Sequence, residues 1–136
     1  MAITYAVESS LSAAECAHLL AATKMAAKRP LKNLARIDKM LRGANFVATA
    51  RNETGLLVGV ARCITDFEWI CYCAELAVRE SHQGQGIGRD LLEFTRRTLG
   101  PNLGLTLNAE PEAVAFYERL GMKPYRAFYM ARERSD

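Results

Sequence analysis

Apolar residues return every three to four positions in four stretches of the chain, which predicts four amphipathic helices. The first stretch begins at Ser12, whose spacing from Glu15 is that of a capping box. The last stretch begins at Pro111, and proline is typical of the first position of a helix. The predicted helices lie between Ser12 and Pro30, at Leu31–Leu41, at Ile87–Leu99 and from Pro111 to Gly121.

Between these stretches, apolar and polar residues alternate or form short apolar runs, which predicts strands. In the run from Trp69 to Val78, the side chains of Trp69, Cys71, Cys73 and Glu75 are expected on one face of the sheet. The predicted strands are Ile3–Val7, Asn45–Ala50, Leu56–Ile64, Trp69–Val78, Leu103–Leu107 and Tyr125–Met130. The order β-α-α-β-β-β-α-β-α-β predicts an α/β (α+β) fold, with a mixed central sheet flanked by about four helices. No repeat or linker divides the chain, so residues 1–136 are expected to form a single domain.

Composition and charge exclude several classes of protein. Half of the 136 residues are hydrophobic and 24% are charged, which excludes a disordered or fibrous chain. The net charge of +3 is scattered, so it gives no indication of a nucleic-acid partner or an anionic membrane. No apolar run approaches the length of a membrane span, and the first residues do not resemble a signal peptide.

The cysteines and histidines predict neither disulfides nor a metal site. No two cysteines form a C-x-x-C pair, and His18 and His82 have no metal-ligand spacing with them. The sequence therefore predicts reduced thiols in the core of a cytoplasmic protein, with no metal. The cysteines are Cys16, Cys63, Cys71 and Cys73.

A glycine-rich segment between a predicted strand and a predicted helix carries the clearest chemical signal. Alternate glycines let the backbone approach a ligand, and the amides at a helix N-terminus attract phosphate groups. The chain lacks the lysine of a P-loop, and Arg89 stands where the Rossmann fingerprint requires its third glycine, so both of those motifs are excluded. The segment consists of Gln83, Gly84, Gln85, Gly86, Ile87, Gly88 and Arg89.

Two motifs in the correct order resemble those of the GCN5-related N-acetyltransferase (GNAT) superfamily. Gln83-x-x-Gly86-x-Gly88, after the strand that ends at Val78, is similar to the acetyl-CoA motif of that family. The strand Leu105–Ala109, followed by the helix with Phe116-Tyr117 and Gly121, is similar to the second family motif. The predicted element order agrees with the superfamily along essentially the whole chain.

The resemblance implies an acetyl-CoA-dependent N-acetyltransferase that transfers the acetyl group directly to an amine in a ternary complex. The partners would be acetyl-CoA and a small-molecule or peptide amine, with no nucleic acid or membrane, and a homodimer is expected by analogy. Tyr117 would be the general acid for the departing thiolate. Asn108 would bind the pantetheine arm. The other residues implied to bind the cofactor are Leu76, Ala77, Val78 and the segment Gln83 to Arg89.

The general base and the acceptor stay open at this point. Tyr72 occupies the position where the histone-acetylating branch has its glutamate, so Glu75 is the candidate carboxylate and Glu68 is a weaker one. A non-catalytic CoA-binding module of the same fold is the alternative. A third hypothesis is a nucleic-acid or protein-binding surface on the basic residues of the first two predicted helices, which are Lys24, Lys28, Arg29, Lys32 and Arg36.

Overall fold

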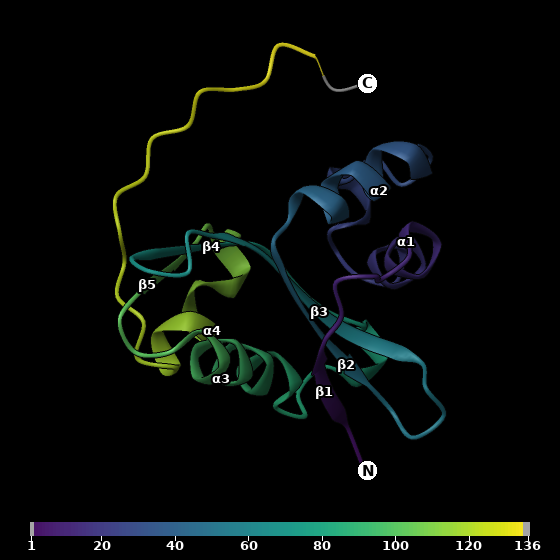
Figure 1. Ribbon diagram of the computed structural model, residues 1–136, viewed down its shortest axis with the longest axis horizontal. Coiled ribbons are helices and arrows are strands. Elements are labelled where there is room, and N and C mark those ends of the chain that lie inside the picture. The colour runs from purple at the N-terminus through teal and green to yellow at the C-terminus, as the bar shows by residue number, and fades with distance from the viewer. Residues whose placement is uncertain (1, 135–136) are drawn as a thin grey trace.

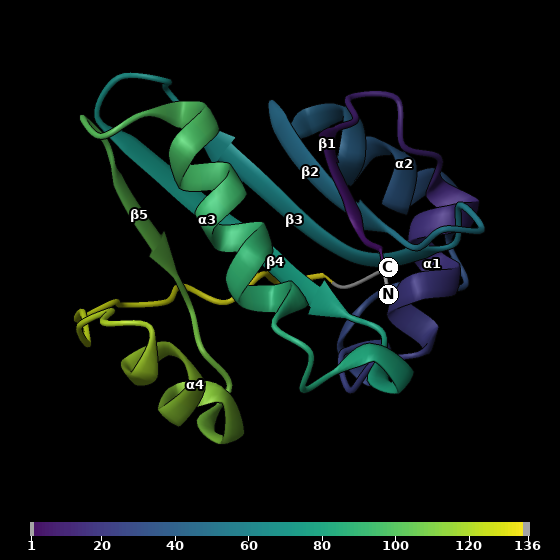
Figure 2. The same ribbon diagram turned by 90° about the horizontal axis from the view of Figure 1, so that it is seen from below.

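Five strands form one mixed sheet in a computed structural model that describes residues 2–134. Strands β1 (Thr4–Val7), β2 (Phe46–Arg51), β3 (Leu57–Thr65) and β4 (Ile70–Val78) pair antiparallel in turn. Strand β5 (Gly104–Leu107) pairs parallel with β4 and forms one edge of the sheet. The parallel pair therefore brings the strand that precedes the glycine-rich segment beside the strand of the second predicted motif (Figures 1 and 2).

Helices cover both faces of the sheet and enclose a separate apolar core on each. Helices α1 (Ala13–Ala21) and α2 (Leu34–Gly43) lie together on one face, and α3 (Ile87–Leu99) lies on the other (Figure 1). The short α4 (Val114–Arg119) packs beside α3 (Figure 2). Three single-turn 3₁₀ helices complete the order, namely η1 (Ala26–Lys28), η2 (Glu80–His82) and η3 (Pro111–Ala113).

The order of the first nine predicted elements is confirmed, but several ends differ. Helix α1 stops at Ala21, and the single turn η1 follows it where the sequence predicted one longer helix. Helix α2 begins at Leu34 instead of Leu31, because the Asn33 side chain accepts a hydrogen bond from the amide of Arg36 and caps the helix there.

The predicted last strand is wrong. Within the described residues, Tyr125–Met130 forms no strand and runs as an extended tail past β5 toward the side of α2 (Figure 1). Its large apolar side chains are exposed, with Phe128 and Met130 each 95% exposed. A strand needs a backbone partner as well as an apolar pattern, and this segment has none among residues 2–134.

A β-bulge in β4 overturns the predicted alternation of its side chains. Arg62 of β3 pairs with Glu75 and the next residue, Cys63, pairs with Cys73, so Ala74 is an extra residue in β4. Beyond it the alternation is reversed. Cys73 packs into the core beneath α3, whereas Glu75 lies on the opposite face, so the expectation that they share one face is wrong.

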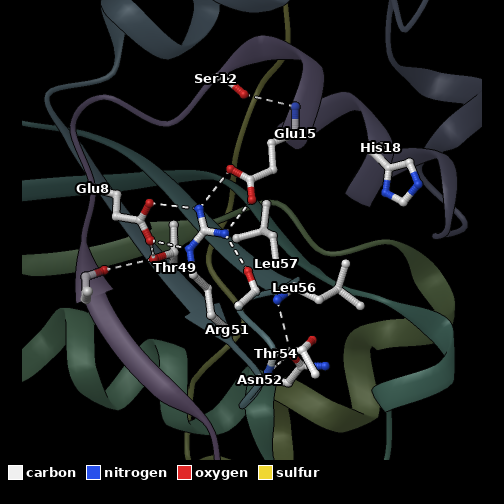
Figure 3. Close-up of polar contacts among 12 residues, drawn as sticks. Glu8, Ser12, Glu15, His18, Thr49, Arg51, Asn52, Thr54, Leu56 and Leu57 are labelled. Atoms are coloured by element: carbon white, nitrogen blue, oxygen red, sulfur yellow. Dashed lines mark hydrogen bonds and ion pairs between the residues drawn. The ribbon is translucent and has the colours of Figure 1, made fainter.

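Arg51 joins β1, α1 and the turn after β2 at one corner of the fold (Figure 3). Its guanidinium donates to both carboxylate oxygens of Glu8, at 2.8 and 2.9 Å, to both oxygens of Glu15, and to the carbonyl of Gly55. The Ser12 hydroxyl accepts from the Glu15 amide at 3.1 Å, which confirms the Ser12 half of the predicted capping box, whereas the Glu15 carboxylate pairs with Arg51. These hydrogen bonds from Arg51 are the main reason that the pKa values of Glu8 and Glu15 lie below the ordinary value.

Candidate active site

Strands β4 and β5 part at the bulge. They pair only from Ile70 to Cys73 on β4, which leaves the β5-facing edge of β4 without a strand partner from Ala74 to Val78 (Figure 2). A cavity of about 1150 Å³ lies at this point, and its lining includes Leu76, Ala77, Val78, Leu107, Asn108 and Tyr117. An unpaired strand edge beside a cavity can bind an extended polar arm through backbone hydrogen bonds.

The glycine-rich segment lies at the N-terminus of α3, where the sequence predicted it. Gly84 and Gly86 have φ values of +80° and +83°, which glycine adopts without strain. Gly86 is the N-cap of α3 and supplies no side-chain cap, so the first amides of the helix stay available to a ligand. A Cβ added to Gly86 would come within 2.6 Å of Arg89 Nη2, which shows that the Arg89 guanidinium lies over the loop. Backbone donors and a cation therefore converge here, which fits a pyrophosphate group.

Two further contacts fix this loop against its neighbours. The Gln83 side-chain amide donates to the carbonyl of Val78 at 3.0 Å and so connects the loop to the end of β4. A Cβ added to Gly88 would lie 3.2 Å from Phe116 Cζ, so α4 packs closely on the first turn of α3. Ile87 is buried in the core beneath the sheet. The loop is therefore held by both strand and helices.

Tyr117 and Asn108 lie on the other side of the cavity. Tyr117 is half-buried, and its ring meets that of Phe116 edge-on at a centroid distance of 5.1 Å. Burial, followed by the electrostatic effect of Cys73, raises the pKa of Tyr117 to about 12, so the phenol keeps its proton at neutral pH. The Asn108 amide donates to Tyr72 Oη at 3.1 Å. The structure thus brings a phenol donor to the cavity that borders the unpaired part of β4.

Glu75 is buried, and both of its carboxylate oxygens are occupied. One oxygen accepts from Arg62 Nε at 3.2 Å, and the other accepts from Arg29 Nε. No motif in the sequence indicated a site role for Arg62. The only signal for Arg62 in the sequence was its charge inside the otherwise apolar run of β3. The contact between Glu75 and Arg29 spans 46 positions and has no local signature in the sequence.

Neither a metal site nor a membrane span is found in the part of the chain that the structure describes. No three His, Cys, Asp or Glu residues of that part lie close enough together to hold a metal ion. None of its helices has the length and apolar character needed to cross a membrane.

Comparison with known proteins gives a consistent result. The family model for the acetyltransferase (GNAT) domain matches residues 42–124. The histone acetyltransferase TAP1 of Glycine max is 32% identical to this chain over 106 residues. The match covers 69% of this chain and 46% of the relative, so the chain spans about half the length of that relative. A GNAT-family acetyltransferase of Streptococcus pneumoniae TIGR4 shares the fold, with a TM-score of 0.71, 20% identity, and coverage of 97% of this chain and 100% of the other. The glucosamine-6-phosphate N-acetyltransferase of Arabidopsis thaliana does so with a TM-score of 0.69, 13% identity, and coverage of 98% and 100%. The family match covers both the parted strands and the glycine-rich loop, and the chain therefore belongs to the GNAT acetyltransferase family.

Proposed function

We propose that this protein transfers an acetyl group from acetyl-CoA to the nitrogen of an amine, directly and within one ternary complex. The GNAT family uses acetyl-CoA as its donor. The observation that carries the proposal is the pair of parted strands beside a glycine-rich helix N-terminus, because this arrangement offers separate sites for an extended arm and for a diphosphate.

Each part of the cofactor has a proposed binding group. The backbone of Leu76–Val78 would pair with the pantetheine arm, and Asn108 would donate to the same arm. The amides of the segment 83–88 would bind the diphosphate, with the Arg89 guanidinium as a charge-assisted donor. Bound acetyl-CoA supplies the activated acyl group as a thioester. The protein has to orient it and to donate a proton to the leaving sulfur.

Tyr117 is proposed as the donor of that proton, from Oη. Its raised pKa keeps the hydroxyl protonated, and its place on the cavity wall sets it opposite the unpaired part of β4. Glu75 was predicted as the proton acceptor for the amine. To do so, Glu75 would have to accept the proton on an oxygen that already accepts a hydrogen bond from a guanidinium, which favours its charged form. Measuring the pH profile of Glu75→Gln tests this role: loss of an acidic limb supports proton acceptance, and an unchanged profile with a lower rate supports a positioning role.

The first experiment is acetyl-CoA binding by calorimetry. Wild type should bind with micromolar affinity, and Gly86→Glu should not, because it puts a carboxylate where the diphosphate is proposed to lie. Gly55→Glu is the matched control, since Gly55 has the same left-handed backbone with φ +86° but lies in the turn between β2 and β3. Folded wild type that does not bind acetyl-CoA would overturn the proposal. Binding without turnover of any amine would favour the non-catalytic module.

We also propose that a homodimer is the functional form. The support is the tail 122–134, in which Tyr125, Phe128 and Met130 are almost fully exposed, and the outer edge of β5, which has no strand partner among the described residues. A tail of one chain that covers the β5 edge of a second chain would bury both features.

A single domain over residues 1–136 and a cytoplasmic location complete the proposal. The cytoplasmic location is supported by buried, free cysteines.

A further inference from the structure

Two arginines share one carboxylate at the base of the cavity. Arg62 is only 9% exposed and Glu75 only 2%, and the side chain of Arg29 is 20% exposed. The three side chains together carry one excess positive charge. An uncompensated charge in a poorly solvated position is costly, so this group favours the approach of an anion.

Both guanidinium groups retain donors that no group within residues 2–134 uses. Arg62 donates only through Nε to Glu75, and Arg29 donates through Nε to Glu75 and through Nη1 to the Lys28 carbonyl. Among the described residues, Thr95 Oγ1 is the single buried side-chain N or O atom that lacks a partner, so the remaining arginine nitrogens are not sealed in the core. Arg62 and Arg29 both line the cavity, so it is the space where their unused donors can meet a ligand.

The rest of the cavity wall has the same sign of charge. Besides Arg62 and Arg29, four basic side chains line it against two acidic ones, and one of the acidic residues, Glu110, is already paired with Lys28. These four are Lys24, Lys28, Arg36 and Arg132. A polyamine would be repelled by this wall, whereas an amine that also carries a negative group would be attracted.

We propose that the acceptor is an amine that carries an acid group, a carboxylate or a phosphate, and that Arg62 and Arg29 bind this group. Both oxyanions match the fork of N–H donors that a guanidinium presents. The inference rests on the proposed function and names the class of its acceptor. The glycine-rich loop offers a separate site for the cofactor diphosphate, so the two arginines do not need to serve it.

Matched pairs of amines test this inference. Phenylalanine is compared with phenethylamine, and phosphoethanolamine with ethanolamine, by release of CoA thiol. The same pairs are also titrated by calorimetry into the protein saturated with CoA. In at least one pair the acid-bearing member should have a kcat/KM or an affinity about 10- to 100-fold higher. The pair that shows the preference then distinguishes a carboxylate acceptor from a phosphate acceptor.

The variant Arg62→Gln should remove this preference and leave acetyl-CoA affinity unchanged. Arg62→Lys should restore part of it, because the charge remains while the fork is lost. Arg119→Gln is the control, since Arg119 is exposed on α4 and does not line this cavity. Equal or undetectable binding of the acid-bearing members, or an equal effect of Arg62→Gln on both members of a pair, overturns the inference. Loss of acetyl-CoA binding by wild type would instead be the failure of the proposed function.

Discussion

Gly59 in β3 lies directly beneath α3, and replacing it by alanine should destabilise the protein. A Cβ at this position would lie 2.9 Å from Leu91 Cδ1, 3.3 Å from Ile87 Cγ2 and 3.4 Å from the Cβ of Ala50. Carbon atoms in protein cores are normally about 3.5 to 4.0 Å apart. Leu91 is completely buried and Ile87 almost so, and therefore α3 or the Leu91 side chain has to move.

The size of the effect follows from two opposing contributions. Adding one carbon to a tightly packed core costs about 1 to 3 kcal/mol. Alanine also restricts the unfolded chain more than glycine does, which offsets about 0.4 to 1 kcal/mol of that cost. For Gly59→Ala we therefore expect a net loss of roughly 1 to 2 kcal/mol in the free energy of unfolding, or about 3 to 5 °C in Tm for each kcal/mol.

Urea unfolding followed by circular dichroism measures this difference directly. Gly43→Ala is the matched control, because Gly43 is the last residue of α2 and an added Cβ would meet nothing within 4 Å. That variant should gain up to about 1 kcal/mol, since alanine is the better helix former. If Gly59→Ala is as stable as wild type, the packing of α3 on β3 is looser than the structure shows. Because α3 carries the proposed diphosphate site, Gly59→Ala should also weaken acetyl-CoA binding.

Three further predictions address the corner at Arg51, the phenol and the tail. Arg51→Gln should lower the free energy of unfolding by about 1 to 2 kcal/mol at pH 7. Arg51 lowers the pKa of Glu8 and Glu15 in the folded protein, so its contribution to the free energy of unfolding is full above the unfolded pKa of about 4.5 and is lost as the pH falls through the folded pKa. If acid unfolding shows that the stability difference between wild type and variant does not shrink below pH 4.5, this reasoning is wrong. Tyr117→Phe should reduce kcat about 10- to 100-fold with acetyl-CoA affinity unchanged. Because the pKa of Tyr117 is raised, this phenol should cause no limb below pH 10 in the pH profile of the wild type. An unaltered kcat would exclude the role of Tyr117 as the acid. Light scattering should show a wild-type dimer and a Phe128→Ser monomer, and a monomeric wild type would refute the proposed assembly.

Local sequence patterns predicted most of the helices and strands, because each pattern depends on residues that lie close together in the sequence. The bounds of α3 agree at both ends, since an amphipathic stripe begins after Gly86 and stops at Gly100. The last strand could not be judged in the same way. The aromatic and apolar residues of Tyr125–Met130 are typical of a strand, but pairing depends on a second backbone that no local pattern reveals.

The site was predictable where a motif is contiguous and not where the chain folds back on itself. The glycine-rich loop lies between β4 and α3 as predicted, and Tyr117 lies on the predicted last helix. The position of Glu75 depends on the bulge at Ala74, which arises from the register between two strands, and its partner Arg29 is 46 positions away. Side chains that act together through long-range contacts leave no periodic signal in the sequence.

The buried cysteines turn the two cores into separate reporters of local opening. A thiol reagent reacts only with a thiolate that it can reach, and all four thiols are at most 3% exposed. Cys16 lies in the core under α1 and α2, whereas Cys63, Cys71 and Cys73 lie in the core under α3. The order in which they become modified under native conditions therefore reveals which face of the sheet opens first. The same burial slows the reaction of the protein's own thiols in an assay that counts released CoA thiol.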